Sequence, residues 1–224
     1  MRALTTSVFD LALGRCCAGC DRPGSVLCAS CTDALRPAVR FRRDVDLTDV
    51  VQDLCIPVVC ALDYRGVVRR ILYRYKDHGI RQLAGALAPA LMASIDCAAG
   101  HAGVSRSTVA LVPMPTRSSS VRRRGFDATA LVVRRAATSA AVAGVAPILR
   151  DVRSSGAAKK AGAMERERGA IDAFHIAPRT RSISAPVILV DDIVTTGATI
   201  REATSTLVLA GVHVIAVASI AGTP

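Results

Sequence analysis

Two adjacent carboxylates followed by small hydroxyl residues make residues 190–199 the most chemically suggestive segment of this sequence. The segment reads Val-Asp-Asp-Ile-Val-Thr-Thr-Gly-Ala-Thr, and the residues before it, 187–190, are apolar and mostly β-branched. We therefore expect a buried strand at 186–192, and ligands of open α/β sheets bind at the carboxyl ends of strands. Asp191 and Asp192 would there accept hydrogen bonds from a vicinal diol, such as the ring hydroxyls of a ribose.

The hydroxyl-rich half of the same segment suits a phosphate group. Gly197 and Ala198 let backbone N–H groups approach a ligand closely, and Thr195, Thr196 and Thr199 add hydroxyl donors. A helix predicted at 199–210 would add the favourable field of its N-terminus. Acids for a diol followed by a phosphate cradle favour a sugar phosphate over a nucleoside triphosphate, and no Walker or dinucleotide-binding motif is present. The alternative is a pair of capping acids and an ordinary Thr-Gly turn.

Five of the eight cysteines lie between residues 16 and 31. They include two C-x2-C pairs, an arrangement that suits a tetrahedral Zn2+ site, with the ligands Cys17, Cys20, Cys28 and Cys31. Cys16 is an adjacent alternative to Cys17. Disulfides or a redox site are the competing interpretations, but structural disulfides are rare in the cytoplasm and a redox pair usually occurs once. A closed four-cysteine site would stabilise the fold rather than perform chemistry.

Alternating apolar runs indicate the elements that must position these residues. Strands are predicted at 58–62, 109–113, 148–149, 186–192 and 212–218, and helices at 67–75, 81–93, 128–143 and 199–210. Residues 116–125 read as a polar, basic loop. Strands alternating with helices predict an α/β fold with a parallel sheet. We expect residues 1–50 to form the cysteine module with a basic connector, and residues 51–224 to form the α/β domain.

Composition limits the function classes further. Apolar residues make up 51% and aromatic residues 3%, so we expect a packed aliphatic core and exclude wholesale disorder. The net charge of +11 attracts phosphates, although it equally suits an Arg-rich surface that only confers solubility. Residues 203–224 are almost uncharged but read as a helix and a buried strand, so we expect a cytoplasmic protein without a membrane span. Cys55, Cys60 and Cys97 are expected to be small buried hydrophobes.

Residues 190–199 closely resemble the ribose-phosphate signature of type I phosphoribosyltransferases. The sequence Leu-Val-Pro-Met-Pro at 111–115 and the Arg-Gly-Phe-Asp at 124–127 resemble the ComF/GntX family, whose members also carry an N-terminal four-cysteine module. Further similar positions are Tyr64-Arg65-Gly66, Lys76, Arg166 and Ala173-Phe174. The chain departs from the family at Asp127-Ala128-Thr129, where Asn-Gln-Ala is usual, and at Gly169, where Asn is usual.

This resemblance implies a type I phosphoribosyltransferase fold with a small N-terminal zinc module. It implies catalytic roles for Asp191 and Asp192 at the ribose, a 5-phosphate site at residues 195–199, and phosphate contacts from one or more of Arg122, Arg123 and Arg124, which alternatively lie on a solvated basic loop. The implied donor is phosphoribosyl pyrophosphate with Mg2+, and the implied reaction is pentosyl transfer. A role in DNA uptake during natural transformation is also implied, with single-stranded DNA and DNA-uptake proteins as partners.

Three classes of function stay open at this point, because a fold does not decide function. The first is an active phosphoribosyltransferase. The second is a non-catalytic protein that senses phosphoribosyl pyrophosphate or binds single-stranded DNA. The third is an adaptor whose zinc module docks other proteins.

Overall fold

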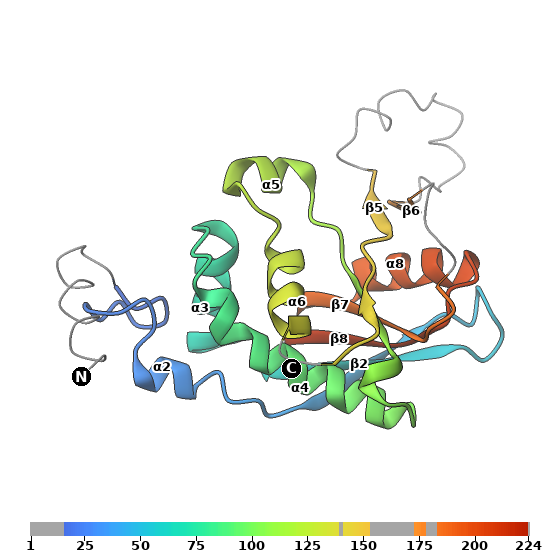
Figure 1. The fold of residues 1–224 in the computed structure, drawn as a ribbon, viewed down its shortest axis with the longest axis horizontal. Coiled ribbons are helices and arrows are strands. Elements are labelled where there is room, and N and C mark those ends of the chain that lie inside the picture. The colour runs from blue at the N-terminus through green and yellow to red at the C-terminus, as the bar shows by residue number, and fades with distance from the viewer. Residues whose placement is uncertain (1–15, 139–140, 153–172, 178–182, 224) are drawn as a thin grey trace.

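The main sheet of this protein has six strands in the order β1-β2-β8-β7-β3-β4 (Figure 1). The computed structural model describes residues 16–138, 141–152, 173–177 and 183–223. Five strands are parallel, namely β2 (Cys55–Asp63), β8 (Val214–Gly222), β7 (Val187–Val194), β3 (Ala110–Pro113) and β4 (Gly144–Val145). The predicted α/β fold with a largely parallel sheet is therefore confirmed.

The edge strand β1 (Arg40–Asp46) is antiparallel to β2, with Arg40 opposite Cys60 and Asp46 opposite Cys55. It lies in the segment for which we predicted a basic connector after the cysteine module. The first fifty residues therefore contribute a strand to the main sheet as well as the cysteines and the short helix α2 (Ala29–Asp33).

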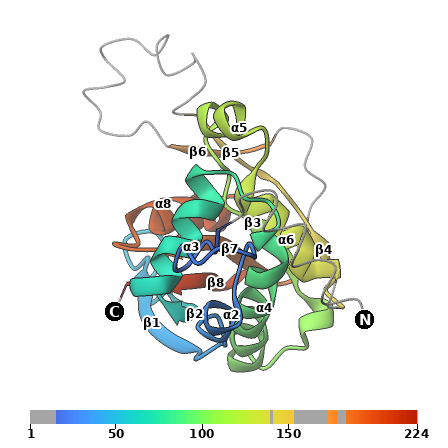
Figure 2. The ribbon, with the colours of Figure 1, turned by 90° about the vertical axis from the view of Figure 1, so that its left-hand side faces the viewer.

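Helices cover both faces of the sheet, and the alternation of side chains along the strands explains how. Ile188 and Val190 pack in one buried cluster with α3 (Gly66–Asp77), α4 (Leu83–His101) and α6 (Ala128–Thr138). Val187 and Leu189 pack in a second cluster with α8 (Ala198–Leu209). Because successive strand residues point to opposite faces, β7 is buried on both sides, and Figure 2 shows the strands between α8 and the pair α4 and α6.

One helix of the described residues, α4, is long and apolar enough to cross a membrane by length and composition alone. In its most apolar window 61% is buried inside the protein, and Leu87 and Leu91 are fully enclosed in the core. The helix therefore has the burial of a core helix. Residues 203–223, the other candidate span in the sequence, divide between α8 and β8 as predicted.

Three predicted elements differ in the structure. The helix predicted at 81–93 extends as α4 to His101. Residues 116–125, predicted as a loop, contain the helix α5 (Ser118–Arg124), because arginine favours helices and Gly125, at a φ of 74°, ends the helix in the left-handed conformation. The helix predicted to extend to residue 143 ends as α6 at Thr138, and the Ala143 backbone N–H instead donates to the Val109 carbonyl beside β4.

A second, two-stranded antiparallel sheet lies next to α5 and consists of β5 (Leu149–Asp151) and β6 (Phe174–Ile176). Figure 1 places it above α8. Arg166 and Gly169, which entered the family comparison above, lie outside the described residues.

Candidate functional site

The two adjacent acids lie within β7 rather than at its end. The strand continues to Val194, with Asp191 opposite Ser219 and Val194 opposite Gly222 of β8. Because strand side chains alternate, Asp191 and Asp192 leave the backbone toward opposite faces of the sheet. Both nevertheless line one cavity of about 220 Å³ at the carboxyl end of the strands. The two carboxylates therefore meet different neighbours and need not have the same role.

Asp192 is held from the side of α3 and α6. Its carboxylate accepts from Lys76 Nζ at 2.9 Å and from the Thr129 hydroxyl at 3.5 Å. The Asp192 side chain is 1% exposed, so its carboxylate has almost no contact with water. The Lys76 ammonium compensates the charge of this buried group. Burial lowers the pKa of Lys76, but the charges of Asp192 and Asp191 outweigh burial and raise it overall, so Lys76 stays protonated.

Asp191 lies on the other side of the strand and is only partly covered. Its carboxylate accepts the backbone N–H of Asp192 at 2.8 Å. Burial and the neighbouring Asp192 charge raise the pKa of Asp191 to about 8, although Lys76 acts in the opposite direction. A carboxylate that is this costly to ionise favours a cation or several hydroxyl donors brought by a ligand.

The turn predicted to bind phosphate follows β7 and leads directly into α8. Gly197 has a φ of 81° and lies immediately before the first residue of the helix, Ala198. A second cavity of about 100 Å³ is lined by Asp191, the turn and the first residues of α8, including Thr195, Thr196, Gly197 and Thr199. The hydroxyls and the helix N-terminus therefore face the same space as the Asp191 carboxylate. This cavity shares Asp191 and Thr199 with the larger one.

The larger cavity also has a basic wall. It is formed by Lys76, Arg117 and Arg124, while Asp151 and Phe174 come from β5 and β6. Arg124 Nε donates to the Ser120 carbonyl at 3.2 Å, and within the described residues its Nη1 is buried without a hydrogen-bond partner. A buried guanidinium nitrogen without an acceptor favours an anionic ligand at this position.

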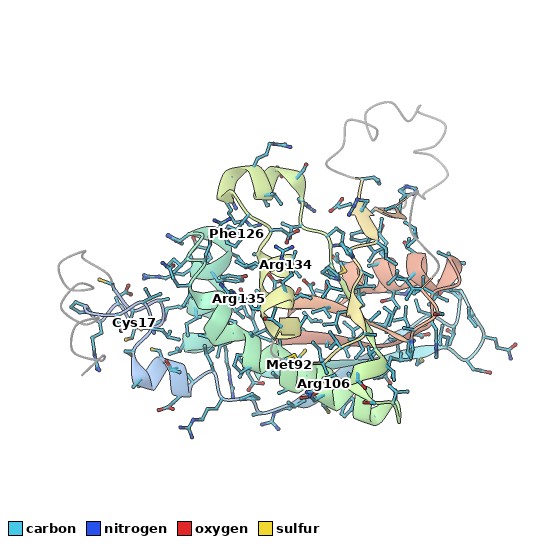
Figure 3. The ribbon with its side chains drawn as sticks, viewed as in Figure 1. Cys17, Met92, Arg106, Phe126, Arg134 and Arg135 are labelled. Atoms are coloured by element: carbon cyan, nitrogen blue, oxygen red, sulfur yellow. The ribbon has the colours of Figure 1, made fainter. Side chains whose placement is uncertain are left out.

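Of the three consecutive arginines that we predicted as phosphate contacts, only Arg124 lines the cavity. Arg122 and Arg123 are exposed on α5, and Arg123 pairs with Asp77 at 3.1 Å. Phe126 fixes the end of α5, because its buried ring lies 6.0 Å from the ring of Tyr75 and 4.8 Å below the Arg81 guanidinium (Figure 3). Helix formation thus separates side chains that are adjacent in the sequence.

Asp127, at which the chain departs from the family pattern, has a local structural role. Its Oδ1 accepts the Ala130 backbone N–H at 2.9 Å and the Thr116 hydroxyl at 2.7 Å. The first bond caps the N-terminus of α6, where aspartate is a favoured residue. The carboxylate thereby also ties α6 to the segment between β3 and α5.

Several cavity residues had no role in our reasoning from residue spacing. Lys76 entered only through the family resemblance, and Arg117, Asp151 and Phe174 received no ligand contact. Lys76 is 116 positions from Asp192 in the sequence, so no local spacing reveals their contact. Phe174 follows a stretch without a periodic pattern and joins the cavity only because β6 pairs with β5.

The four predicted metal ligands come together at the other side of α3. The Sγ atoms of Cys17, Cys20, Cys28 and Cys31 all lie within 4.8 Å of one another. Cys20 and Cys28 Sγ are 3.7 Å apart, which matches the edge of about 3.8 Å expected for a tetrahedron with metal–sulfur bonds near 2.3 Å. The group could therefore hold a metal such as zinc. It contains Cys17 rather than Cys16, which resolves the choice between them.

Backbone N–H groups donate to the sulfur of one cysteine of this group. The N–H groups of Gly19 and Cys28 point to Cys17 Sγ at 3.4 and 3.3 Å. Burial raises the pKa of Cys17, but these and a third backbone donor lower it overall. The Ser30 hydroxyl and the Cys31 N–H lower the pKa of Cys28 to about 6. Donors directed at sulfur are typical of thiolate ligands in metal sites, whose charge they stabilise.

The other cysteines divide by exposure. Cys60 is fully buried in β2, as predicted, and Cys97 is partly buried on α4. Cys55 is exposed at the start of β2, so the prediction of a buried side chain is wrong there. The apolar run around it extends one residue beyond the part of the strand that the core covers.

Comparisons with known proteins do not assign a function to this chain. A scan against models of protein families finds no match for this chain, and a search of curated proteins finds none either. The acid pair, the threonine-rich turn and the basic wall are therefore the observations from which a function has to be argued.

Proposed function

We propose that the cavity at the end of β7 binds phosphoribosyl pyrophosphate and that the protein is a ComF-like phosphoribosyltransferase. One observation carries the proposal: a carboxylate of high pKa, Asp191, lies between a phosphate-sized cavity at the start of α8 and a larger cavity with a basic wall. Phosphoribosyl pyrophosphate carries a 5-phosphate, a ribose diol and a pyrophosphate, which match the small cavity, Asp191 and the larger cavity in that order. The resemblance of residues 190–199 to the ribose-phosphate signature supports the same ligand.

Each part of the site has a role in this proposal. The turn at Thr195–Thr196–Gly197 and the N-terminus of α8 hold the 5-phosphate. Asp191 accepts hydrogen bonds from the ribose hydroxyls, and Asp192 stays paired with Lys76. Arg124 and Arg117 face the pyrophosphate, and guanidinium groups match its oxygens in bidentate geometry.

The reaction proposed is displacement of pyrophosphate from the anomeric carbon by an acceptor nucleophile. The bond to the leaving oxygen breaks as positive charge develops on the ribose ring. Asp191 stabilises this charge once the bound ligand or a cation compensates the cost of ionising it. Oxygen ligands such as Asp191 suit Mg2+, which when bound would neutralise the pyrophosphate leaving group. Arg124 stabilises the same group directly and excludes water from one side of it.

The experiment is calorimetry of the full chain with phosphoribosyl pyrophosphate and Mg2+. We expect binding by the wild type and its loss in Gly197→Val, because a side chain is strained at a φ of 81° and blocks the approach of a phosphate. Gly100→Val, at a position with open space around it, is the control for a folded protein. Equal binding by all three proteins would contradict the proposal.

Turnover separates the enzyme from a sensor that keeps the same site. We expect pyrophosphate release when the donor is incubated with the correct acceptor from a set of nucleobases. Binding without release for every acceptor would favour the non-catalytic alternative. Either result leaves the assignment of the donor site intact.

We further propose that the four-cysteine group binds zinc. Four thiolates in a closed set leave no coordination position for a substrate, so the metal stabilises the fold. The sulfur–sulfur distance of 3.7 Å and the N–H donors to Cys17 support zinc over a pair of disulfides, which require sulfur atoms near 2.0 Å.

Single-stranded DNA is a second candidate ligand, and it is favoured by the exposed basic face of α3 and α5. Arg69 on α3 and Arg122 on α5 are exposed, and the ion pair of Asp77 with Arg123 brings the two helices together. Tyr73 is 54% exposed on the same helix as Arg69 and offers a ring on which a base could stack. This face is distinct from the residues that line the donor cavity.

A further inference from the structure

We infer that Lys76 is a positioning residue for the acid pair, and that the four-cysteine segment positions Lys76 by anchoring α3. Metal binding at the cysteines would then determine the geometry of the carboxylates on the other side of α3. The ligand part of this inference rests on the proposed donor site, whereas its structural part does not.

The first link is the contact of Lys76 with Asp192. The ammonium lies 2.9 Å from a carboxylate that is almost completely buried, and Thr129 supplies the second contact at 3.5 Å. If Lys76 were lost, Asp192 would keep one weak hydrogen bond and an uncompensated buried charge. The Asp192 side chain would then rotate, and the hydrogen bond that its backbone N–H donates to the Asp191 carboxylate would be disturbed.

The second link is the packing of the cysteine segment on α3. Cys17, Ala18 and Cys31 belong to the same buried cluster as Ile71 and Leu72 of the helix. The cysteine segment therefore has no separate core, and its buried side chains complete that of α3.

The backbone of the first C-x2-C pair, residues 17–20, also lies close to the helix. A methyl group added at Gly19 would lie 3.0 Å from Val67 Cγ1 and 2.6 Å from Cys31 Sγ, closer than ordinary contact. Gly19 therefore lies close both to a metal-binding sulfur and to the start of α3. In the proposed arrangement, movement of the sulfurs shifts the start of the helix.

The third link is at the end of α3, where consecutive residues hold three different parts of the protein. Arg74 Nη2 lies 2.5 Å from Asp21 Oδ1. Asp21 directly follows Cys20, the second cysteine of the first C-x2-C pair. The Tyr75 hydroxyl donates to the Ala128 carbonyl of α6 at 2.6 Å, and Lys76 reaches Asp192. Residues two apart on a helix point in nearly opposite directions, so Arg74 and Lys76 extend to opposite sides.

Metal is needed in this arrangement because the Arg74–Asp21 pair is weak by itself. The Asp21 side chain is mostly exposed, and exposed ion pairs contribute little unless their partners are already fixed. A metal bound by Cys20 would fix the backbone directly before Asp21 and so restrict where the Asp21 side chain can lie. The pair then restrains the last turn of α3 and, through it, the Lys76 ammonium.

Hydrogen exchange measured by mass spectrometry tests the structural part on the full chain loaded with zinc. We expect Lys76→Met and Arg74→Met to raise exchange in residues 190–199, and chelation of the metal to do the same. Lys76→Arg should restore protection, since it keeps the charge. Arg70→Met, an exposed arginine on the same helix, is the matched control. Unchanged exchange in 190–199 after chelation and in Arg74→Met would overturn the inference.

Calorimetry with phosphoribosyl pyrophosphate and Mg2+ tests the ligand part. We expect Arg74→Met to weaken binding by about threefold, although Arg74 does not line the cavity, and Lys76→Met to weaken it by about tenfold or more. If the wild type binds but Arg74→Met equals Arg70→Met, the inference fails. If the wild type does not bind, the proposed function fails, and hydrogen exchange alone decides the inference.

Discussion

Replacing Asp191 by asparagine should stabilise the protein at high pH and leave its stability at low pH nearly unchanged. Burial and Asp192 raise the pKa of Asp191 to about 8, whereas an unfolded aspartate loses its proton near 3.9. Between these two values the folded protein binds more protons than the unfolded chain. The free energy of unfolding of the wild type therefore falls as pH rises through this window, by at most about 1.4 kcal/mol per pH unit.

Asparagine removes this titration but keeps the contact that Asp191 makes. Its side-chain oxygen can still accept the Asp192 backbone N–H, which lies 2.8 Å from the present carboxylate. Because Asp191 is only partly covered, water screens part of its charge, and we expect a gain of about 1–2 kcal/mol at pH 8. For a chain of this size that corresponds to a rise in Tm of roughly 2–8 °C.

The assay is thermal unfolding at half-unit steps from pH 5 to pH 8.5, with the difference between variant and wild type as the readout. This difference cancels the titration of the cysteines and histidines. Asp96→Asn, which removes an exposed carboxylate paired with Arg106, is the control and should show no gain that grows with pH. A gain for Asp191→Asn of the same size at pH 5 and pH 8 would refute the reasoning.

Three further predictions concern the metal, the phosphate and DNA. Purified protein should contain about one equivalent of zinc by elemental analysis, and Cys28→Ser should lose most of it; a stable, metal-free wild type would contradict this. Thr196→Val should weaken ribose 5-phosphate binding by about threefold to tenfold in calorimetry, because one hydroxyl donor is lost, while Thr138→Val should bind normally. Single-stranded DNA should bind in a salt-sensitive manner, and a joint Arg122→Ala and Arg123→Ala variant should flatten the salt dependence; an unchanged slope would exclude α5 from the interface.

Local sequence patterns were sufficient for the elements that surround the acid pair. The apolar run before Asp191 predicted β7, and the periodicity after Gly197 predicted α8, because both elements are defined by which of their own residues are buried. The repeated C-x2-C spacing likewise predicted a four-cysteine group that the structure brings together. In each case the signal lies within about fifteen residues.

Features that depend on distant partners could not be predicted in this way. Strand β1 is rich in charged residues and lacks a clear alternation, so only its pairing with β2 makes it a strand. The contact of Lys76 with Asp192 joins residues on different elements. The prediction ended the strand at Asp192, whereas β7 continues to Val194, because element ends are poorly determined by local sequence. Whether the site residues act as proposed stays a prediction.

The antiparallel edge strand β1 has a practical consequence for dissecting this protein. A truncated chain that begins near residue 51 would lose β1 and leave the backbone of β2 without a partner on one side. Unpaired strand edges recruit other chains, so such a fragment should self-associate even though every residue of the ligand cavity is present. Phe41 would also leave the ring of His101 on α4, with which it now stacks at 4.8 Å. Fragments intended to separate the cysteines from the cavity are therefore better made by point substitution than by deletion.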